Sequence, residues 1–226
     1  MMKLNKSWNR RARGLQAGFI QAALLFGIAL MTAVLGGFAL ANRSPTSQTD
    51  VEQAKVNSSV ILKQASDLRD GVARFSSDFG SSSVQSRLDF SNTASQGLFD
   101  PSARYASPQI MPTSAFAVGE DSTIKAPAAA VAGHWYLNKA TIGHTLSTAS
   151  ADPMVLLPGL RQDVCGRVNT LLYGSNTIPV ATAAMAAWIG GGDGGISASA
   201  GATGWPEGCV QTSDSKYVYF KVVQEN

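Results

Sequence analysis

The longest apolar stretch of the chain covers residues 17–41 and contains no charged side chain. At about 1.5 Å of rise per residue, a helix of this length measures roughly 37 Å, which is enough to cross a hydrocarbon core of about 30 Å. Basic residues precede the stretch and no acidic residue does; they are Lys3, Lys6, Arg10, Arg11 and Arg13. Because basic flanks remain on the cytoplasmic side, we predict an inner-membrane helix with its N-terminus inside and the remaining chain exported.

The fate of this segment after insertion is open between three alternatives. A secretory signal peptide would be cleaved after Ala41, at an A-x-A site, although the apolar core of such a peptide is usually only about 7 to 15 residues long. An uncleaved helix would anchor the chain in the membrane. The third alternative is cleavage between Gly18 and Phe19, where a short basic leader ends in glycine and an unbroken apolar run begins.

The net charge excludes one class of partner. The whole chain carries a formal charge of +3, from 18 basic and 15 acidic residues. Loss of residues 1–18 would remove five basic residues, which leaves 13 against 15 and a net charge of −2. A weakly acidic exported domain lacks the basic surface that nucleic-acid binding needs, so we expect no nucleic-acid partner.

The two cysteines, Cys165 and Cys209, both lie in the part of the chain that is expected to be exported. In an oxidising compartment a single pair is expected to form one disulfide. Two buried free thiols are the alternative. A zinc site is not expected, because two cysteines and two distant histidines match no structural zinc spacing.

A second periodic segment lies between residues 50 and 80. Its apolar positions recur at steps of three and four, which predicts the buried face of an amphipathic helix. This stripe comprises Val51, Ala54, Ser58, Ile61, Ala65, Leu68, Val72, Phe75 and Phe79. Pro45 is expected to kink or break the chain within residues 42–49, before Thr49 or Asp50 caps the new helix.

Together these features resemble a type IV pilin or a type II secretion pseudopilin. The resemblance rests on a basic leader of the class III prepilin type ending in Gly18, a membrane helix opening at Phe19, and an amphipathic helix ending near an aromatic–Gly step. In that family the first half of one long helix sits in the membrane and later in the filament core, and the second half packs on a C-terminal antiparallel sheet. A late disulfide commonly closes a distal loop, which is the role that the resemblance implies for Cys165 and Cys209.

One position departs from the family pattern. Most pilins carry a glutamate four residues after the first mature residue, where it helps to recruit and register subunits. This chain has Ala23 at that position. Since members that sit at filament tips can lack the glutamate, the departure favours a minor or tip-like subunit over a major one.

The expected fold class is α+β. A long N-terminal helix, with a membrane half over 19–41 and an amphipathic half over 50–80, would pack on a β-rich exported domain over 81–226 that contains an antiparallel sheet and one disulfide. Within this domain the local patterns predict six segments. These are a loop with short irregular elements over 81–115, a strand over 134–137, a turn over 153–159, a short helix over 160–173, a glycine-rich loop over 190–204, and a strand over 216–223 that closes or edges the sheet.

Motifs for nucleophilic catalysis are weak. His134 and His144 are the only histidines, and their spacing indicates no catalytic triad. The segments 122–125 and 213–216 fit the pattern S-x-x-K, but the companion motifs are missing. We therefore expect no enzyme and no catalytic residue.

A metal site is also not expected. Asp193, in a glycine-rich segment, and Glu207 are weak candidates for oxygen ligands of calcium. Two acidic residues rarely complete the six or more oxygen contacts that calcium takes. We expect no cofactor.

The sequence thus favours a structural filament subunit, processed at Gly18–Phe19 by a prepilin peptidase and assembled in the membrane with other pilin-like subunits. Small residues in the first helix half would permit close helix packing. The expected packing residues are Ala22, Ala23, Gly27, Gly36 and Gly37 in the first half, and Ile61, Leu68, Val72 and Phe75 in the second. The alternatives are an uncleaved single-pass envelope binding protein and a secreted hydrolase or lectin released at Ala41.

Overall fold

The computed structural model describes residues 45–90, 97–100, 102, 105–117, 135–140, 151–196 and 201–225. The chain divides into two compact units, Met1–Asp50 and Val51–Asn226, and every element below belongs to the second unit except the start of the first helix. Several predicted features lie outside the described residues. They are the leader, the apolar run with Gly18, Phe19, Ala22, Ala23, Gly27, Gly36 and Gly37, both histidines, and the S-x-x-K segment 122–125.

The first described element is helix α2, which covers Pro45–Phe79. Proline fits the first turn of a helix because its missing N–H has no intrahelical acceptor there and its fixed φ is already helical. Thr49 and Asp50 lie inside the helix, so the prediction that one of them caps it is wrong. Residues 45–49 of the predicted kink belong to this helix, and its remaining positions lie outside the described residues.

One face of α2 forms the centre of the main core. The predicted stripe supplies its fully buried side chains, which include Ile61, Ala65, Leu68, Val72 and Phe75. Val51, the first member of the stripe, is 55% exposed. The stripe therefore packs on the domain from Ala54 onward, whereas Val51 is largely exposed.

Gly80 follows the last residue of α2; it has a φ of +86° and donates its N–H to the Ser76 carbonyl at 2.8 Å. Glycine is favoured there because this left-handed region is strained for other residues. A seven-residue helix, α3, follows over Ser81–Arg87, and a 3-10 turn, η1, covers Thr113–Ala115. Both fall in the segment predicted to be loop with short irregular elements.

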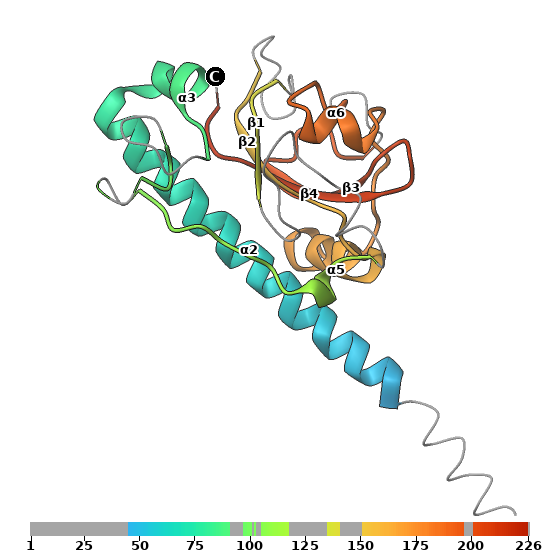
Figure 1. Ribbon diagram of the computed structural model, residues 1–226. Helices are drawn as coiled ribbons and strands as arrows, with labels where there is room; N and C mark the ends of the chain where they lie inside the picture. Colours follow the sequence, from blue (N-terminus) through green and yellow to red (C-terminus); the bar gives the residue numbers. More distant parts are fainter. Residues whose placement is uncertain are drawn as a thin grey trace, which may run out of the picture. The chain divides into compact units, whose positions relative to one another are not determined.

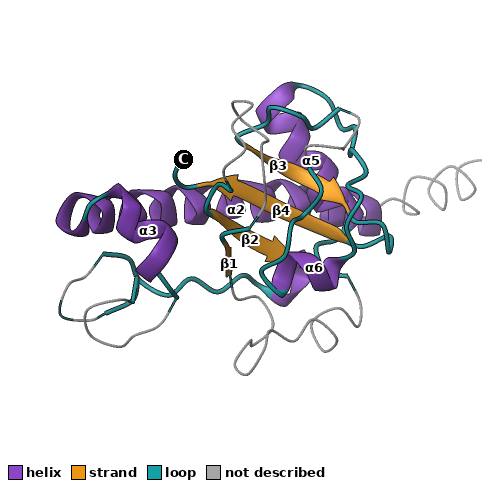
Figure 2. Ribbon diagram, turned by 90° about the horizontal axis from the view of Figure 1, so that it is seen from above, coloured by secondary structure: helices purple, strands orange, loops and turns teal. Residues whose placement is uncertain are grey.

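Four antiparallel strands form one sheet in the order β1-β2-β4-β3 (Figure 2). The strands are β1 Tyr136–Asn138, β2 Met154–Pro158, β3 Glu207–Gln211 and β4 Tyr217–Val222. In register, Leu156 lies opposite Phe220, and Cys209 lies opposite Tyr219. The α+β prediction, with a long helix and an antiparallel sheet, is confirmed.

Two predictions about the strands are wrong. Strand β2 occupies residues where a turn was predicted over 153–159, because Pro158 falls at the strand end, where its missing N–H is tolerated. Strand β4 lies in the interior of the sheet, between β2 and β3, so the C-terminal strand neither closes nor edges the sheet. Apart from Tyr217, each of its residues is buried.

Helices cover both faces of the sheet (Figure 1). Helix α5, over Gln162–Tyr173, agrees with the predicted helix and lies with α2 on one face, where it meets Val155, Leu157 and Tyr219. The short helix α6, over Met185–Ile189, lies on the other face with Met154, Leu156 and Phe220. Because side chains alternate along a strand, each central strand contributes to both cores.

Candidate functional site

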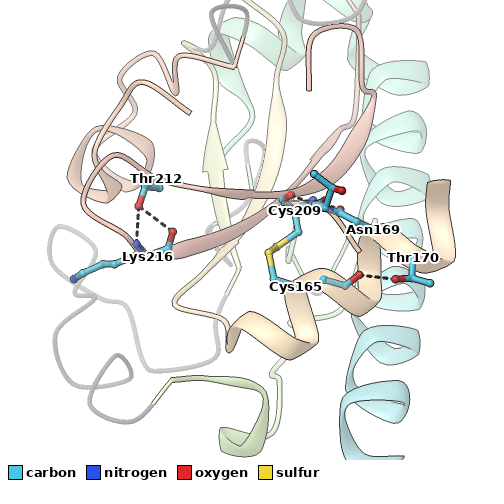
Figure 3. The surroundings of a disulfide bond; sticks show 8 residues. Cys165, Asn169, Thr170, Cys209, Thr212 and Lys216 are labelled. Carbon is cyan, nitrogen blue, oxygen red and sulfur yellow. Dashed lines mark hydrogen bonds between the residues drawn. A yellow bond between two sulfur atoms is a disulfide. The ribbon is translucent and has the colours of Figure 1, made fainter. Parts of the chain in front are cut away.

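The predicted disulfide is present. Cys165 of α5 and Cys209 of β3 are joined, with their Cα atoms 5.4 Å apart and a sequence separation of 44 (Figure 3). Both side chains are fully buried. The bridge ties α5 to an outer strand of the sheet, and the free-thiol alternative is wrong.

Beside this bridge lies a side chain that the sequence analysis missed. Asn169 is fully buried, and its Nδ2 donates to the Cys209 carbonyl at 2.8 Å and to the Thr177 carbonyl at 2.9 Å. Its Oδ1 accepts the Cys209 N–H at 2.9 Å (Figure 3). The spacing of Cys165 and Asn169 could have indicated this contact, because residues four positions apart share a helix face. A disulfide at Cys165 therefore brings Asn169 toward Cys209.

A polar cluster lies around Glu207, on the face of the sheet that carries α5. Its Oε2 is 2.8 Å from Lys221 Nζ, and its Oε1 accepts the Tyr219 hydroxyl at 2.6 Å. The Tyr173 hydroxyl donates to the backbone carbonyl of Glu207. Burial raises the pKa of Tyr219 well above its ordinary value, and burial raises the pKa of Tyr173 to about 12. Both phenols are thus neutral donors at physiological pH.

Asp193 and Glu207, the weak calcium candidates, are not brought together. Asp193 follows α6, and its Oδ1 accepts the Gly195 N–H at 3.0 Å within its own turn. Glu207 shares the opposite face of the sheet with Cys209, and Lys221 and Tyr219 already bind its carboxylate. Within the described ranges, no group of three His, Cys, Asp or Glu residues could hold a metal ion.

The second S-x-x-K segment lies in the turn between β3 and β4. Thr212 donates its hydroxyl to the Lys216 carbonyl at 3.1 Å and accepts the Lys216 N–H at 3.2 Å (Figure 3). Ser213 donates its backbone N–H to the Ala183 carbonyl at 3.0 Å. These bonds shape a hairpin, and a turn role explains the residues without any nucleophilic chemistry.

A hollow of about 590 Å³ lies along α2. Its lining includes the acidic residues Asp67, Asp70 and Asp100 together with Arg74 and Tyr105. The Tyr105 hydroxyl donates to Asp78 Oδ2 at 2.7 Å, and this hydrogen bond, followed by burial, raises the pKa of Tyr105. Asp67 in this lining pairs with Lys63 at 2.9 Å, and Asp100 accepts hydrogen bonds from the Ser102 N–H and hydroxyl.

In the part of the chain that the structure describes, no helix is both long and apolar enough to cross a membrane. Comparison with known proteins gives no match: no family model fits the chain, and no curated protein or solved structure is significantly similar to it.

Proposed function

We propose that the chain is a structural subunit of a type IV pilus or of a type II secretion-type pseudopilus, in a minor or tip-like position. The observation that carries the proposal is the order of its parts. An apolar run of membrane-spanning length precedes helix α2, and the buried face of α2 packs on a four-stranded antiparallel sheet with one disulfide. This order matches the pilin-like architecture that the leader and the apolar run suggest.

In this proposal residues 19–41 form the membrane half of the long helix. A prepilin peptidase cleaves between Gly18 and Phe19, and the helix then leaves the lipid to join a bundle of related helices. Small residues such as Gly27 and Gly36 allow the close backbone approach that replaces lipid contacts. Before assembly the chain resides in the inner membrane, with its C-terminal domain exported.

The exposed apolar residues of α2 support assembly through this helix. Val51 and Val56 are 55% and 61% exposed. Single exposed valines are ordinary on a protein surface. Both lie in the first turns after the polar segment 42–50 that follows the apolar run, and in this proposal a neighbouring subunit's helix would cover them.

The second candidate is an uncleaved, membrane-anchored envelope binding protein. The hollow beside α2 favours it, because that hollow is lined by Asp70, by Asp67, which pairs with Lys63, and by Asp100, which accepts hydrogen bonds from Ser102. Ala23, in place of the usual glutamate, is compatible with this alternative as well.

Cell fractionation separates these candidates. Surface filaments are sheared from the native cells, and the chain is followed by immunoblotting in sheared, membrane and soluble fractions. A filament subunit is expected in the sheared fraction, and Gly18→Asp is expected to hold it in the membrane at its full mass. Gly14→Asp, which introduces the same charge elsewhere in the leader and leaves Gly18–Phe19 intact, is the matched control. A wild-type chain found only in the membrane, with the same mass as Gly18→Asp, would instead support the anchored binding protein.

A further inference from the structure

A second hollow, of about 330 Å³, is lined by helix α2, by the end of strand β4 and by the chain that follows β4. This volume is at the lower end of the range of about 300 to 1,000 Å³ in which proteins bind small molecules. Pro206, Val222 and Val223 form an apolar part of the lining, and the rest of it is mainly charged. The charged groups decide which ligand the hollow suits.

Lys221 brings a nearly buried ammonium group to this hollow. The residue is 9% exposed, and its Nζ donates to Glu207 Oε2 at 2.8 Å. A lysine ammonium has three N–H donors. Among the residues that the structure describes, Glu207 is the one acceptor of Lys221. Two N–H groups of Lys221 are therefore available to another acceptor, in a place where little water reaches them.

Glu207 also lines the hollow, but its negative charge is compensated. Its Oε2 is bound to Lys221, and its Oε1 accepts the Tyr219 hydroxyl at 2.6 Å. Both oxygens of the carboxylate are thus in use within the protein. Glu207 therefore orients Lys221 at the hollow and leaves no oxygen for a cationic ligand.

Arg69 adds a second cation to the same hollow from the side of α2. It is exposed, and no residue within the described ranges forms a hydrogen bond or an ion pair with it. A guanidinium presents a planar fork of N–H donors that matches the two oxygens of a carboxylate. Glu225, the other acidic residue of the lining, is exposed and does not pair with Arg69.

We propose that this hollow binds a small aliphatic carboxylate. The carboxylate accepts hydrogen bonds from Arg69 and from the available N–H groups of Lys221, and the alkyl chain contacts the apolar part of the lining. A single negative charge suits the site better than two, because Glu225 would repel the second. The inference goes beyond the filament proposal, and it holds whether the chain is cleaved, anchored or assembled.

The test uses butyrate as the probe, added to the isotope-labelled full chain in detergent at constant ionic strength. Butyramide, which has the same shape without the charge, is added in a parallel titration. NMR should show saturable shifts of the backbone amide signals of residues 222–225 with butyrate and much smaller shifts with butyramide. Shifts that do not saturate with butyrate, or that are equal for the two compounds, would overturn the proposal.

A pair of variants assigns the binding to this hollow. Arg69→Gln removes the guanidinium fork from an exposed position, and it is expected to raise the Kd for butyrate at least about tenfold, because charge-assisted hydrogen bonds are lost. Lys63→Gln, the matched control, removes an exposed cation from the same helix outside this lining and should leave the Kd unchanged. An equal Kd in the two variants would contradict the assignment of Arg69 and with it the site.

Discussion

Lys221 Nζ lies 2.8 Å from Glu207 Oε2, in a pair whose side chains are only 11% and 15% exposed. The two residues face each other across the β3–β4 ladder, and the Tyr219 hydroxyl completes the shell of the carboxylate. A charge withdrawn from water is costly when its partner is missing. This pair therefore stabilises the β3–β4 hairpin only as long as both charges remain.

Loss of the cation of this pair should be severe. Lys221→Met leaves the Glu207 carboxylate largely buried without a counter-charge, and we expect a loss of about 2 to 4 kcal/mol in the free energy of unfolding. Lys63→Met, which breaks the exposed ion pair with Asp67 at 2.9 Å, should cost less than about 1 kcal/mol. Urea unfolding followed by near-UV circular dichroism measures both. Equal losses would show that the Glu207–Lys221 pair is solvated in solution.

Alkaline pH should destabilise the fold through its buried phenols. Burial raises the pKa of Tyr219 well above 10, so the folded chain keeps a proton that the unfolded chain loses near pH 10. The resulting stability is fully present below pH 10 and is lost as the pH rises toward the folded pKa, at up to about 1.4 kcal/mol per pH unit.

Tyr219→Phe tests this dependence. The variant should lower the free energy of unfolding at pH 8, because the hydrogen bond to Glu207 is lost. Between pH 10 and 11 the free energy of unfolding should decline less steeply than in the wild type, because the buried phenol is gone. Urea unfolding at pH 8, 10 and 11 gives both quantities. An unchanged slope would assign the alkaline sensitivity to other groups, such as Tyr173 or Tyr105.

Gly71 is the point where the chain around Tyr105 crosses α2. A Cβ at Gly71 would lie 2.8 Å from the Tyr105 carbonyl oxygen and 2.8 Å from the Ala106 Cβ. Alanine is normally about 1 kcal/mol better than glycine inside a helix. Gly71→Ala should nevertheless lower the free energy of unfolding by about 1 to 3 kcal/mol, because the crossing segment must move. The melting temperature should fall accordingly. Ser66→Ala, on the exposed face of the same helix, should be neutral or stabilising; a stabilising Gly71→Ala would contradict this packing.

Two glycines of the segment after α6 form a matched pair. Gly191 and Gly195 have similar positive φ values of +74° and +66°, so alanine carries a similar backbone strain at each. A Cβ at Gly195 would clash with Thr182 Oγ1, whereas a Cβ at Gly191 meets nothing within 4 Å. Gly195→Ala should therefore be the more destabilising variant, by about 1 kcal/mol or more. Similar thermal melting curves for the two variants would show that Gly195 does not pack against Thr182.

The sequence was most informative where periodicity was long. The buried face of α2 and the helix around Cys165 were predictable because their apolar residues repeat at helical spacing. This spacing places them on one face of the helix whatever that face packs against. The short strand β3 was missed, since Glu207, Gly208 and Gln211 give it no apolar alternation. Strand β2 was missed because the flanking prolines indicate a turn.

The polar contacts were least predictable. By residue type Glu207 is a weak candidate for a metal ligand, yet its partner is Lys221, which follows 14 positions later on the paired strand. The role of Asn169 depends on the register of α5 against β3, which is fixed by packing and by the disulfide. The residue types and their local spacing do not show which residues of distant segments lie opposite each other.

The most direct test of the filament proposal is the mass of the mature N-terminus, measured on protein extracted from the membranes of its native cell. The proposal predicts a chain that begins at Phe19, carrying the added methyl group typical of processed pilins. A chain that begins at Met1 would leave an uncleaved anchor, and a chain that begins at Asn42 would be a secreted protein. Either of these two masses contradicts assembly as a pilin-like subunit.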